Sequence, residues 1–96
     1  QAGRMEEAAR LYREIIKQDP YFIYALHNLG TIMIRKKRYA AGLKFYSEVL
    51  KIAPSYRPTL ENLAVYYMKK RDYKKAGAMI KNALDSASCP DEKRYY

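Results

Sequence analysis

Two asparagines lie 34 residues apart, each directly before a leucine: Asn28 before Leu29, and Asn62 before Leu63. An asparagine amide carries both a hydrogen-bond donor and an acceptor, so it can pair with a peptide unit whatever side chains that peptide carries. The same amide can instead bond to a neighbouring helix, because polar helix residues often satisfy one another. The repeated asparagine therefore indicates either a peptide-binding position or a structural hydrogen bond.

Each asparagine belongs to a stripe of mostly polar residues at helical spacing. The first stripe contains Tyr24, His27, Asn28, Thr31 and Arg35. The second stripe contains Glu61, Asn62, Val65 and Lys69. Neither stripe includes the apolar positions that we expect in the core, so both are candidates for a surface that binds a partner.

Basic residues form a second candidate surface, which repeats at the same interval and which we call the basic edge. Its members are Lys36, Lys37, Arg38, Lys70 and Arg71, and they directly follow Arg35 and Lys69 of the two stripes. The net charge is +9, and residues 21–83 contain thirteen Lys or Arg but only three acidic residues. Such a surface can attract an acidic peptide, a phosphate group or an RNA backbone. The alternative is that these residues are solvated and only complement the negative ends of helix dipoles.

No residue pattern indicates catalysis, a metal or a cofactor. His27 is the single histidine and has no second ligand at metal-binding spacing, and Cys89 has no histidine partner. We therefore expect a protein that is not an enzyme and that needs no cofactor. A single cysteine cannot form an internal disulfide, which favours a reducing, cytoplasmic location. No apolar run approaches the roughly 18 residues needed to span a bilayer.

The elements that must position these residues are helices, because apolar residues recur at intervals of three and four and no segment alternates like a strand. We expect helices at about 4–18, 21–36, 39–52, 56–70 and 73–87. Pro20 and Pro54 end the first and third helices, since the residue before a proline avoids helical geometry. Ser55 is a candidate N-cap for the fourth helix.

The helices must bury their apolar faces against one another. The residues predicted to point inward are Ala25, Leu26, Leu29, Ile32 and Met33; Leu43, Tyr46, Val49 and Leu50; Leu60, Leu63, Ala64 and Tyr67; and Ala76, Met79, Ile80, Ala83 and Leu84. Gly30 with Gly42, and Ala64 with Ala76, place small residues where paired helices would cross. Their axes can then approach to the short end of the roughly 8–10 Å packing range.

These landmarks recur with a 34-residue period, which is typical of a helical unit that is copied and stacked. The full copy contains Leu26, Leu29, Gly30, Met33, Tyr39, Gly42, Tyr46, Val49 and Pro54. The next copy contains Leu60, Leu63, Ala64, Tyr67, Tyr73, Ala76, Ile80 and Ala83. The pattern resembles the tetratricopeptide repeat. The resemblance implies an all-α, right-handed α-solenoid of antiparallel helix pairs, with about two and a half repeats.

The same resemblance divides the chain into four parts. Residues 1–22 would be the second helix of a partial repeat, 23–56 and 57–90 complete repeats, and 91–96 the start of a further helix or a tail. Ser88 stands where a closing proline belongs, and Pro90 is displaced by two residues. We expect a turn from Ser86 to Pro90.

In tetratricopeptide proteins, the first helix of each pair lines a concave groove that holds an extended peptide. An asparagine before the Leu-Gly pair recurs in O-linked N-acetylglucosamine transferases and in peroxisomal targeting-signal receptors, where it grips the peptide backbone. Asn28 and Asn62 match that position. The carboxylate clamp of chaperone-tail receptors is matched less well, because His27 and Thr31 stand where that subgroup has Lys and Asn.

The sequence therefore predicts a protein-interaction scaffold whose groove binds an extended, acidic segment of a partner protein. One alternative is a basic module that binds RNA or another anionic surface. A second alternative is a self-assembling array, because the first helix lacks a partner that would cover Leu11 and Ile15 and such apolar faces tend to be buried against another chain. Insertion into a membrane is not expected.

Overall fold

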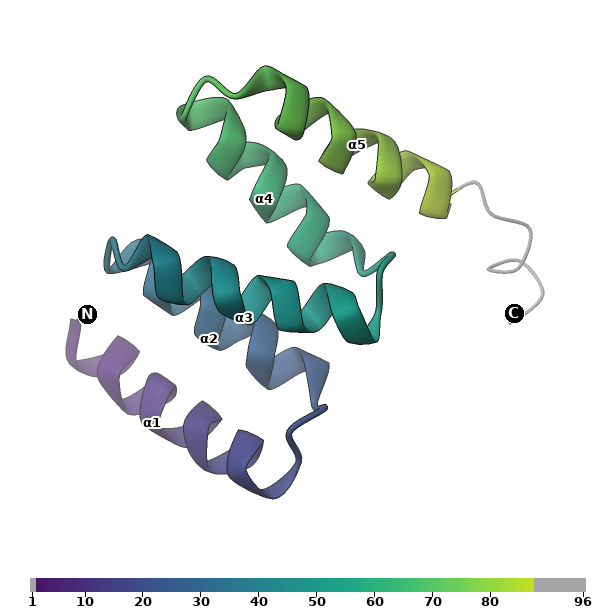
Figure 1. Ribbon diagram of the computed structural model, residues 1–96. Helices are drawn as coiled ribbons and strands as arrows, with labels where there is room; N and C mark the ends of the chain where they lie inside the picture. Colours follow the sequence, from purple (N-terminus) through teal and green to yellow (C-terminus); the bar gives the residue numbers. More distant parts are fainter. Residues whose placement is uncertain (1, 88–96) are drawn as a thin grey trace. The chain divides into compact units, whose positions relative to one another are not determined.

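The structure is a computed structural model, and it describes residues 2–87. Over these residues the chain forms α1 (Ala2–Gln18), α2 (Ile23–Arg35), α3 (Tyr39–Ile52), α4 (Arg57–Lys69) and α5 (Tyr73–Ala87) (Figure 1). No strand occurs in this part of the chain. The predicted all-α fold is confirmed, and each helix begins and ends within two residues of its predicted boundary.

The predictions for the end of the chain fall mostly outside the described residues. Ser86 and Ala87 belong to α5, so the expected turn does not begin at Ser86. The rest of that turn and the further helix or tail at 91–96 lie outside residues 2–87 and stay predictions.

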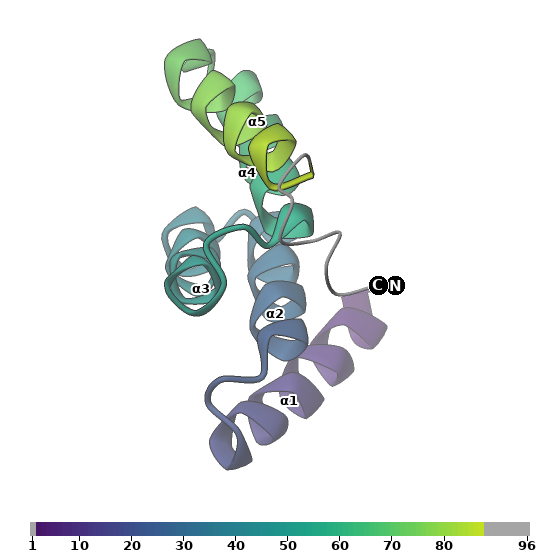
Figure 2. The ribbon, with the colours of Figure 1, turned by 90° about the vertical axis from the view of Figure 1, so that its right-hand side faces the viewer.

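The helices form two compact units, Gln1–Pro54 with α1, α2 and α3, and Ser55–Tyr96 with α4 and α5. In the first unit α2 packs against both α1 and α3 and lies between them (Figure 2). In the second unit α4 packs against α5. Consecutive helices of a unit run in opposite directions (Figure 1). The predicted antiparallel helix pairs are therefore present in both units.

The core of the first unit takes side chains from all three helices. Its buried cluster and the half-buried residues around it are Ala9, Leu29, Ile32 and Met33, with Met5, Ala8, Tyr12, Ile16, Ala41 and Phe45. Every α2 residue predicted to point inward is buried. In α3 the prediction holds fully for Tyr46 and Val49, while Leu43 and Leu50 are half-buried. The 3.6-residue period thus placed the α2 stripe correctly.

In the second unit, α4 buries Leu60, Leu63 and Ala64, and α5 buries Ala76 and Ala83. Tyr67 and Met79 are half-buried.

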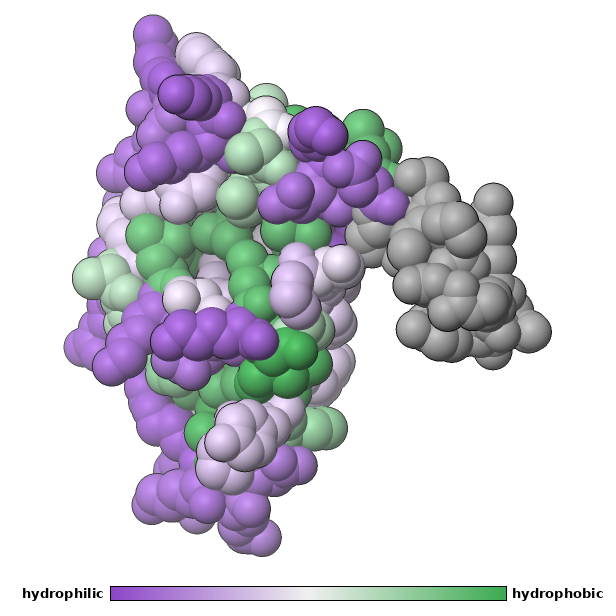
Figure 3. Space-filling model, turned by 45° about the vertical axis from the view of Figure 1, so that its right-hand side comes forward, coloured by the Kyte–Doolittle hydropathy of each residue, from purple (hydrophilic) through white to green (hydrophobic). Residues whose placement is uncertain are grey.

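The predicted burial of Ile80 and Leu84 is wrong, because these side chains are 44% and 58% exposed. Each follows an inward residue, Met79 or Ala83, by one position, which rotates it by about 100° around the helix. Within its unit, α5 packs against α4 alone, so this second stripe meets no helix there. Figure 3 shows hydrophobic residues gathered in patches among hydrophilic ones on one face of the molecule.

The crossing of α2 and α3 depends on two glycines, as the sequence predicts. A Cβ atom at Gly42 would lie 2.5 Å from Cδ1 of Ile34 and 3.0 Å from the carbonyl oxygen of Gly30. A Cβ atom at Gly30 would lie 2.8 Å from Cδ1 of Tyr46. Real Cβ atoms essentially never come within 3.0 Å of another atom, so a side chain at either glycine would force Ile34 or Tyr46 to shift.

The turn after α2 contains a residue in the left-handed region, Lys37, with φ of 65°. The N–H of Lys37 donates to the carbonyl of Ile34 (2.9 Å), and the N–H of Arg38 donates to the carbonyl of Met33 (2.8 Å). This pair of bonds is a Schellman motif, which usually has glycine at the left-handed position. The turn after α4 repeats it around Arg71, with φ of 62°.

The N-termini of α4 and α5 differ from one another. The N-cap of α4 is Tyr56, so the predicted cap at Ser55 is wrong. Tyr56 has extended backbone geometry, and its carbonyl already accepts the N–H of Leu60 (3.2 Å). At α5, a carboxylate oxygen of Asp72 accepts the N–H of Lys75 (3.2 Å), which is the side-chain cap that α4 lacks.

Candidate functional site

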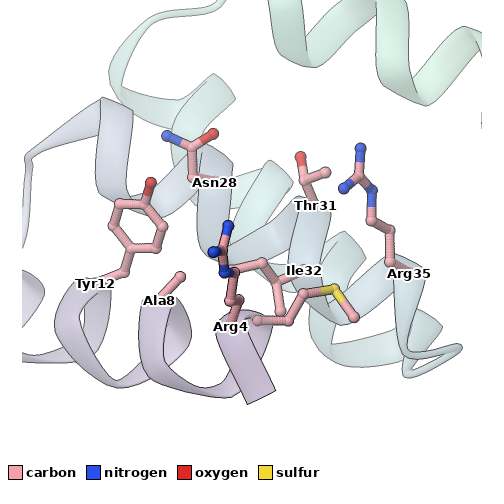
Figure 4. Close-up of a pocket in the computed structure, with 8 residues that line it drawn as sticks. Arg4, Ala8, Tyr12, Asn28, Thr31, Ile32 and Arg35 are labelled. Atoms are coloured by element: carbon pink, nitrogen blue, oxygen red, sulfur yellow. The ribbon is translucent and has the colours of Figure 1, made fainter. Parts of the chain in front are cut away.

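An open pocket of about 490 Å³ lies between α1 and α2, and we call it the α1/α2 pocket (Figure 4). Its lining residues are Arg4, Met5, Ala8 and Tyr12 of α1 and Asn28, Thr31, Ile32 and Arg35 of α2. The lining contains two cations, two hydroxyls, one amide and no carboxylate. In Figure 4 the polar ends of Tyr12, Asn28, Thr31 and Arg35 point to the same side of the pocket.

The two helices that form the pocket are held together on their apolar faces and by one ion pair. Ala9 of α1 is completely buried, which lets α1 approach α2 closely. Glu6 of α1 pairs with Lys36 at the end of α2. The hydrogen bond and the charge of Lys36 lower the pKa of the Glu6 carboxyl below its ordinary value of 4.5. These contacts hold α1 and α2, the two helices that line the α1/α2 pocket, against each other.

Asn28 has an unsatisfied donor in this pocket. Its Nδ2 atom is buried and donates to none of the described residues. A buried donor without a partner costs about 1–3 kcal/mol, so native proteins rarely keep one without a reason. The alternative from sequence, in which this amide nitrogen bonds to a neighbouring helix, is not what the structure shows. Nδ2 of Asn28 is therefore a donor that no described residue satisfies, on a side chain that lines the pocket.

Thr31 joins the pocket to α3. Its hydroxyl donates to the carbonyl of His27 (3.1 Å) and lies 2.6 Å from the hydroxyl of Tyr46. Since a threonine has one hydroxyl hydrogen, the Tyr46 hydroxyl donates to Thr31 in this arrangement. The rings of His27 and Tyr46 are stacked, with centroids 5.4 Å apart. Burial lowers the pKa of His27 below its ordinary value of 6.5.

These contacts separate the first predicted stripe into two groups. Asn28, Thr31 and Arg35 line the α1/α2 pocket together. His27 does not line it, and its ring lies against Tyr46 of α3.

Tyr24 lies outside the lining but contacts Tyr12, which belongs to it. The two rings meet edge to face with centroids 6.4 Å apart, and Phe22 lies 6.3 Å from Tyr24. We call Tyr12, Phe22 and Tyr24 the aromatic cluster. Phe22 and Tyr24 are 42% and 58% exposed, so the cluster is accessible at the N-terminal end of α2.

The second predicted stripe lies on α4, in the other compact unit, and none of its residues lines the α1/α2 pocket. Glu61 pairs with Arg57 one turn earlier on the same helix (3.0 Å). Asn62 is half-buried, and Val65 and Lys69 are exposed. The binding roles predicted for these residues stay predictions.

The predicted basic edge contains residues with distinct local roles. Lys36 is paired with Glu6, and its side chain is only 23% exposed. Lys70 places its ammonium group 5.8 Å from the ring centre of Tyr66. Lys37 and Arg71 form the left-handed turns, and Arg38 is exposed.

Three polar or aromatic residues of the pocket and the cluster were not predicted from the sequence: Arg4, Tyr12 and Phe22. Arg4 lies about two turns before Tyr12 on α1. The spacing of eight residues puts both on one face of a helix, which is a signal that sequence could have supplied. The sequence does not indicate that this face of α1 lies next to Asn28 of α2.

Two other kinds of site are absent from residues 2–87. This part of the chain contains no group of three His, Cys, Asp or Glu residues placed to hold a metal ion. None of its helices is long and apolar enough to cross a membrane.

Residues 23–56 match the family model of the tetratricopeptide repeat. The matched segment contains α2, α3 and the asparagine stripe of the first unit. The predicted resemblance is therefore supported over this segment. The narrower resemblance to the asparagine-groove proteins stays a prediction.

A crystal structure of MamA has a similar fold, with a TM-score of 0.79 and 17% sequence identity. The similarity covers 97% of this chain and 53% of the MamA chain, so the chain spans about half the length of that protein. At this identity the likeness shows the fold alone. A comparison with curated protein sequences gives no match. Tetratricopeptide folds generally mediate contacts between proteins and are typically scaffolds rather than catalysts.

Proposed function

We propose that this chain is a protein-interaction scaffold and that α1 and α2 bind an extended, acidic peptide segment of a partner. The observation that carries this proposal is the buried, unpaired Nδ2 of Asn28, in a pocket that contains two arginines and no carboxylate. An acceptor from a partner would satisfy that donor, and the positive charge favours an acidic ligand.

The roles of the individual residues follow from their chemistry. Asn28 donates to a backbone carbonyl of the peptide, because a backbone acceptor is present at every residue of any ligand. Arg35 selects for acidic side chains, because its guanidinium can donate two parallel hydrogen bonds to a carboxylate. Asn62 and Lys69 occupy the equivalent positions of the next repeat, and the proposal gives them the same roles.

The test uses two fluorescein-labelled degenerate peptide libraries of equal length, one rich in Asp and Glu and one rich in Asn and Gln. We expect the acidic library to bind more tightly, as measured by fluorescence anisotropy. Asn28→Ala combined with Asn62→Ala should weaken binding by about 1–3 kcal/mol, since peptide groups lose hydrogen bonds. Arg35→Gln combined with Lys69→Gln should reduce the dependence of binding on salt.

Asn82→Ala is the matched control, because Asn82 is an exposed amide on α5. It should leave binding unchanged. The groove assignment is wrong if the two asparagine substitutions have no more effect than this control. It is also wrong if they unfold the protein, which circular dichroism would show. The RNA-binding alternative predicts instead that a single-stranded RNA homopolymer binds with a steep salt dependence and ignores the asparagine substitutions.

Self-association is a second candidate function, and exposed apolar residues on α1 and α5 favour it. Leu11 and Ile15 are 55% and 38% exposed, and Leu84 is 58% exposed. Light scattering over a range of concentrations should show a mass that rises with concentration. Leu11→Glu and Leu84→Glu should each reduce that rise. A strict monomer at high concentration would exclude this function.

A further inference from the structure

We propose that the α1/α2 pocket and the aromatic cluster together bind a bipartite peptide motif. A carboxylate side chain of the peptide would bind Arg4 and Arg35, and an apolar side chain would pack on Tyr24, about five residues away along an extended peptide. The inference rests on the proposed function and goes beyond it, since it adds α1 residues to the site and specifies the ligand's sequence. The basic end, the aromatic end and the distance between them carry it.

The basic end consists of two arginines that come from different helices. Neither Arg4 nor Arg35 is ion-paired with any residue in the described range 2–87. Both are exposed, and both line the same pocket. The carboxylate of Glu6, on the same helix as Arg4, is paired with Lys36. A carboxylate from a ligand is therefore the partner that the two guanidinium groups lack.

The aromatic end provides apolar contact area. Phe22 and Tyr24 are exposed, and the edge-to-face contact with Tyr12 holds the Tyr24 ring beside the pocket. Aromatic side chains that are already in place give large contact areas at a low cost in conformational entropy. An aliphatic or aromatic side chain of the ligand can cover the exposed part of this surface.

The distance between the two ends sets the spacing of the motif. Tyr24 and Arg35 lie on the same helix, eleven residues apart, which corresponds to about 16 Å along its axis. An extended peptide advances about 3.3 Å per residue, so about five residues cover that distance. Asn28 lies between the two ends, and its unpaired Nδ2 is the donor that the proposed function assigns to the peptide backbone. One peptide can thus use all three features at once.

The probes are fluorescein-labelled peptides of about ten residues on a Ser and Gln background, each carrying one Phe and one Glu. One peptide places Phe and Glu five residues apart and another places them two residues apart. Two further peptides replace Glu by Gln or Phe by Ala. We expect the five-residue spacing to bind at least about tenfold more tightly than the two-residue spacing, because only the former reaches both ends.

Substitutions in the protein test which end of the bipartite site binds which side chain of the peptide. Arg4→Gln with Arg35→Gln should weaken binding of the Glu peptide about tenfold and leave the Gln peptide unchanged. Arg10→Gln with Arg13→Gln is the matched control, since it removes the same charge from exposed α1 residues that do not line the pocket. Tyr24→Ala should weaken binding of the Phe peptide and leave the Ala peptide unchanged.

The outcomes separate this inference from the function on which it rests. Acidic peptides could bind with an affinity that depends on Asn28 but falls equally in the Arg4/Arg35 and Arg10/Arg13 variants. In that case the bipartite site is wrong and the proposed function stands. If the spacing has no effect, the bipartite site is also wrong. If no peptide binds and Asn28→Ala has no effect on either library, both proposals fail. Binding of single-stranded RNA that depends on Arg4 and Arg35 but ignores Tyr24 would overturn the bipartite site as well.

Discussion

The helix pairs α2/α3 and α4/α5 follow the same 34-residue pattern, but they fill one equivalent position differently. In α2/α3 that position is Tyr46, which is 2% exposed and whose hydroxyl bonds to Thr31. In α4/α5 it is Ile80, which is 44% exposed, and the residue equivalent to Thr31 is Val65. A large aromatic side chain is buried where a second helix offers it both a ring contact and a hydrogen-bond partner.

The helix crossings of the two pairs also differ in the residues that occupy them. Gly30 and Gly42 bring α2 and α3 into backbone contact, whereas Ala64 and Ala76 at the equivalent positions keep their Cβ atoms. Gly77, one position after Ala76, faces open space, so it has no packing role in the described structure. The two repeats therefore place small residues at equivalent positions, but only α2/α3 has glycine at both of them.

The largest expected effect comes from filling the glycine crossing of α2 and α3. Gly42→Val should lower the free energy of unfolding by about 2–3 kcal/mol, because its Cβ would overlap Ile34 and approach the carbonyl of Gly30. Gly77→Ala is the matched control and should raise stability by about 1 kcal/mol, since alanine is the better helix former and finds free space. Urea denaturation measures both. Equal effects of the two substitutions would show that the close crossing does not matter.

A smaller effect is expected at the left-handed turns, where the two helix pairs have the same backbone geometry. Lys37→Gly and Arg71→Gly should each stabilise the protein by about 0.5–1 kcal/mol, because both residues have positive φ and glycine adopts it without strain. Lys44→Gly, at an exposed position inside α3, should instead destabilise it by about 1 kcal/mol. Thermal unfolding distinguishes the two signs. Loss of stability in Lys37→Gly would contradict the role given to this turn.

The smallest effect concerns protonation of His27, whose equivalent in α4 is Glu61. Burial lowers the pKa of His27 below 6.5 in the folded protein, so the unfolded chain binds the proton more tightly. The stabilising contribution is present above that pH and is lost as the pH falls through the lower folded value. The free energy of unfolding should therefore decrease as the pH is lowered from about 7.5 to about 5.5.

His27→Gln provides the control for this pH dependence, because His27 is the single histidine of the chain. The variant should flatten the decrease in that range. Glu6 does not interfere, since its pKa lies below 4.5 and its contribution is lost only in more acidic solution. An unchanged pH profile in His27→Gln would show that the stacked histidine is not the group that titrates.

The local pattern of the chain was sufficient to predict the helices. Apolar residues at intervals of three and four located five helices, and Pro20 and Pro54 located two of the breaks. The pattern failed at Ile80 and Leu84, because an amphipathic face is buried only where another element covers it. It failed again at Ser55, because a residue type that favours the N-cap position does not determine the residue at which the helix begins.

The candidate site was predicted in part. Asn28, Thr31 and Arg35 share one face of a helix by their spacing alone, and the structure brings them into one pocket. Arg4 and Tyr12 could not be added from sequence, because they belong to another helix and no local rule states which residues face each other across two helices. His27 was assigned to the same stripe, but the contact with Tyr46 holds its ring against α3.

The sequence by itself determined the helical class, the 34-residue repeat and the glycine crossing, because each depends on residue type and spacing along one segment. The tertiary structure alone decided that Nδ2 of Asn28 is buried without a partner and that two arginines from different helices line one pocket. Burial and charge at a given atom depend on the side chains that neighbouring helices bring to it. Those neighbours are set by how the helices pack, which the spacing within a single helix does not specify.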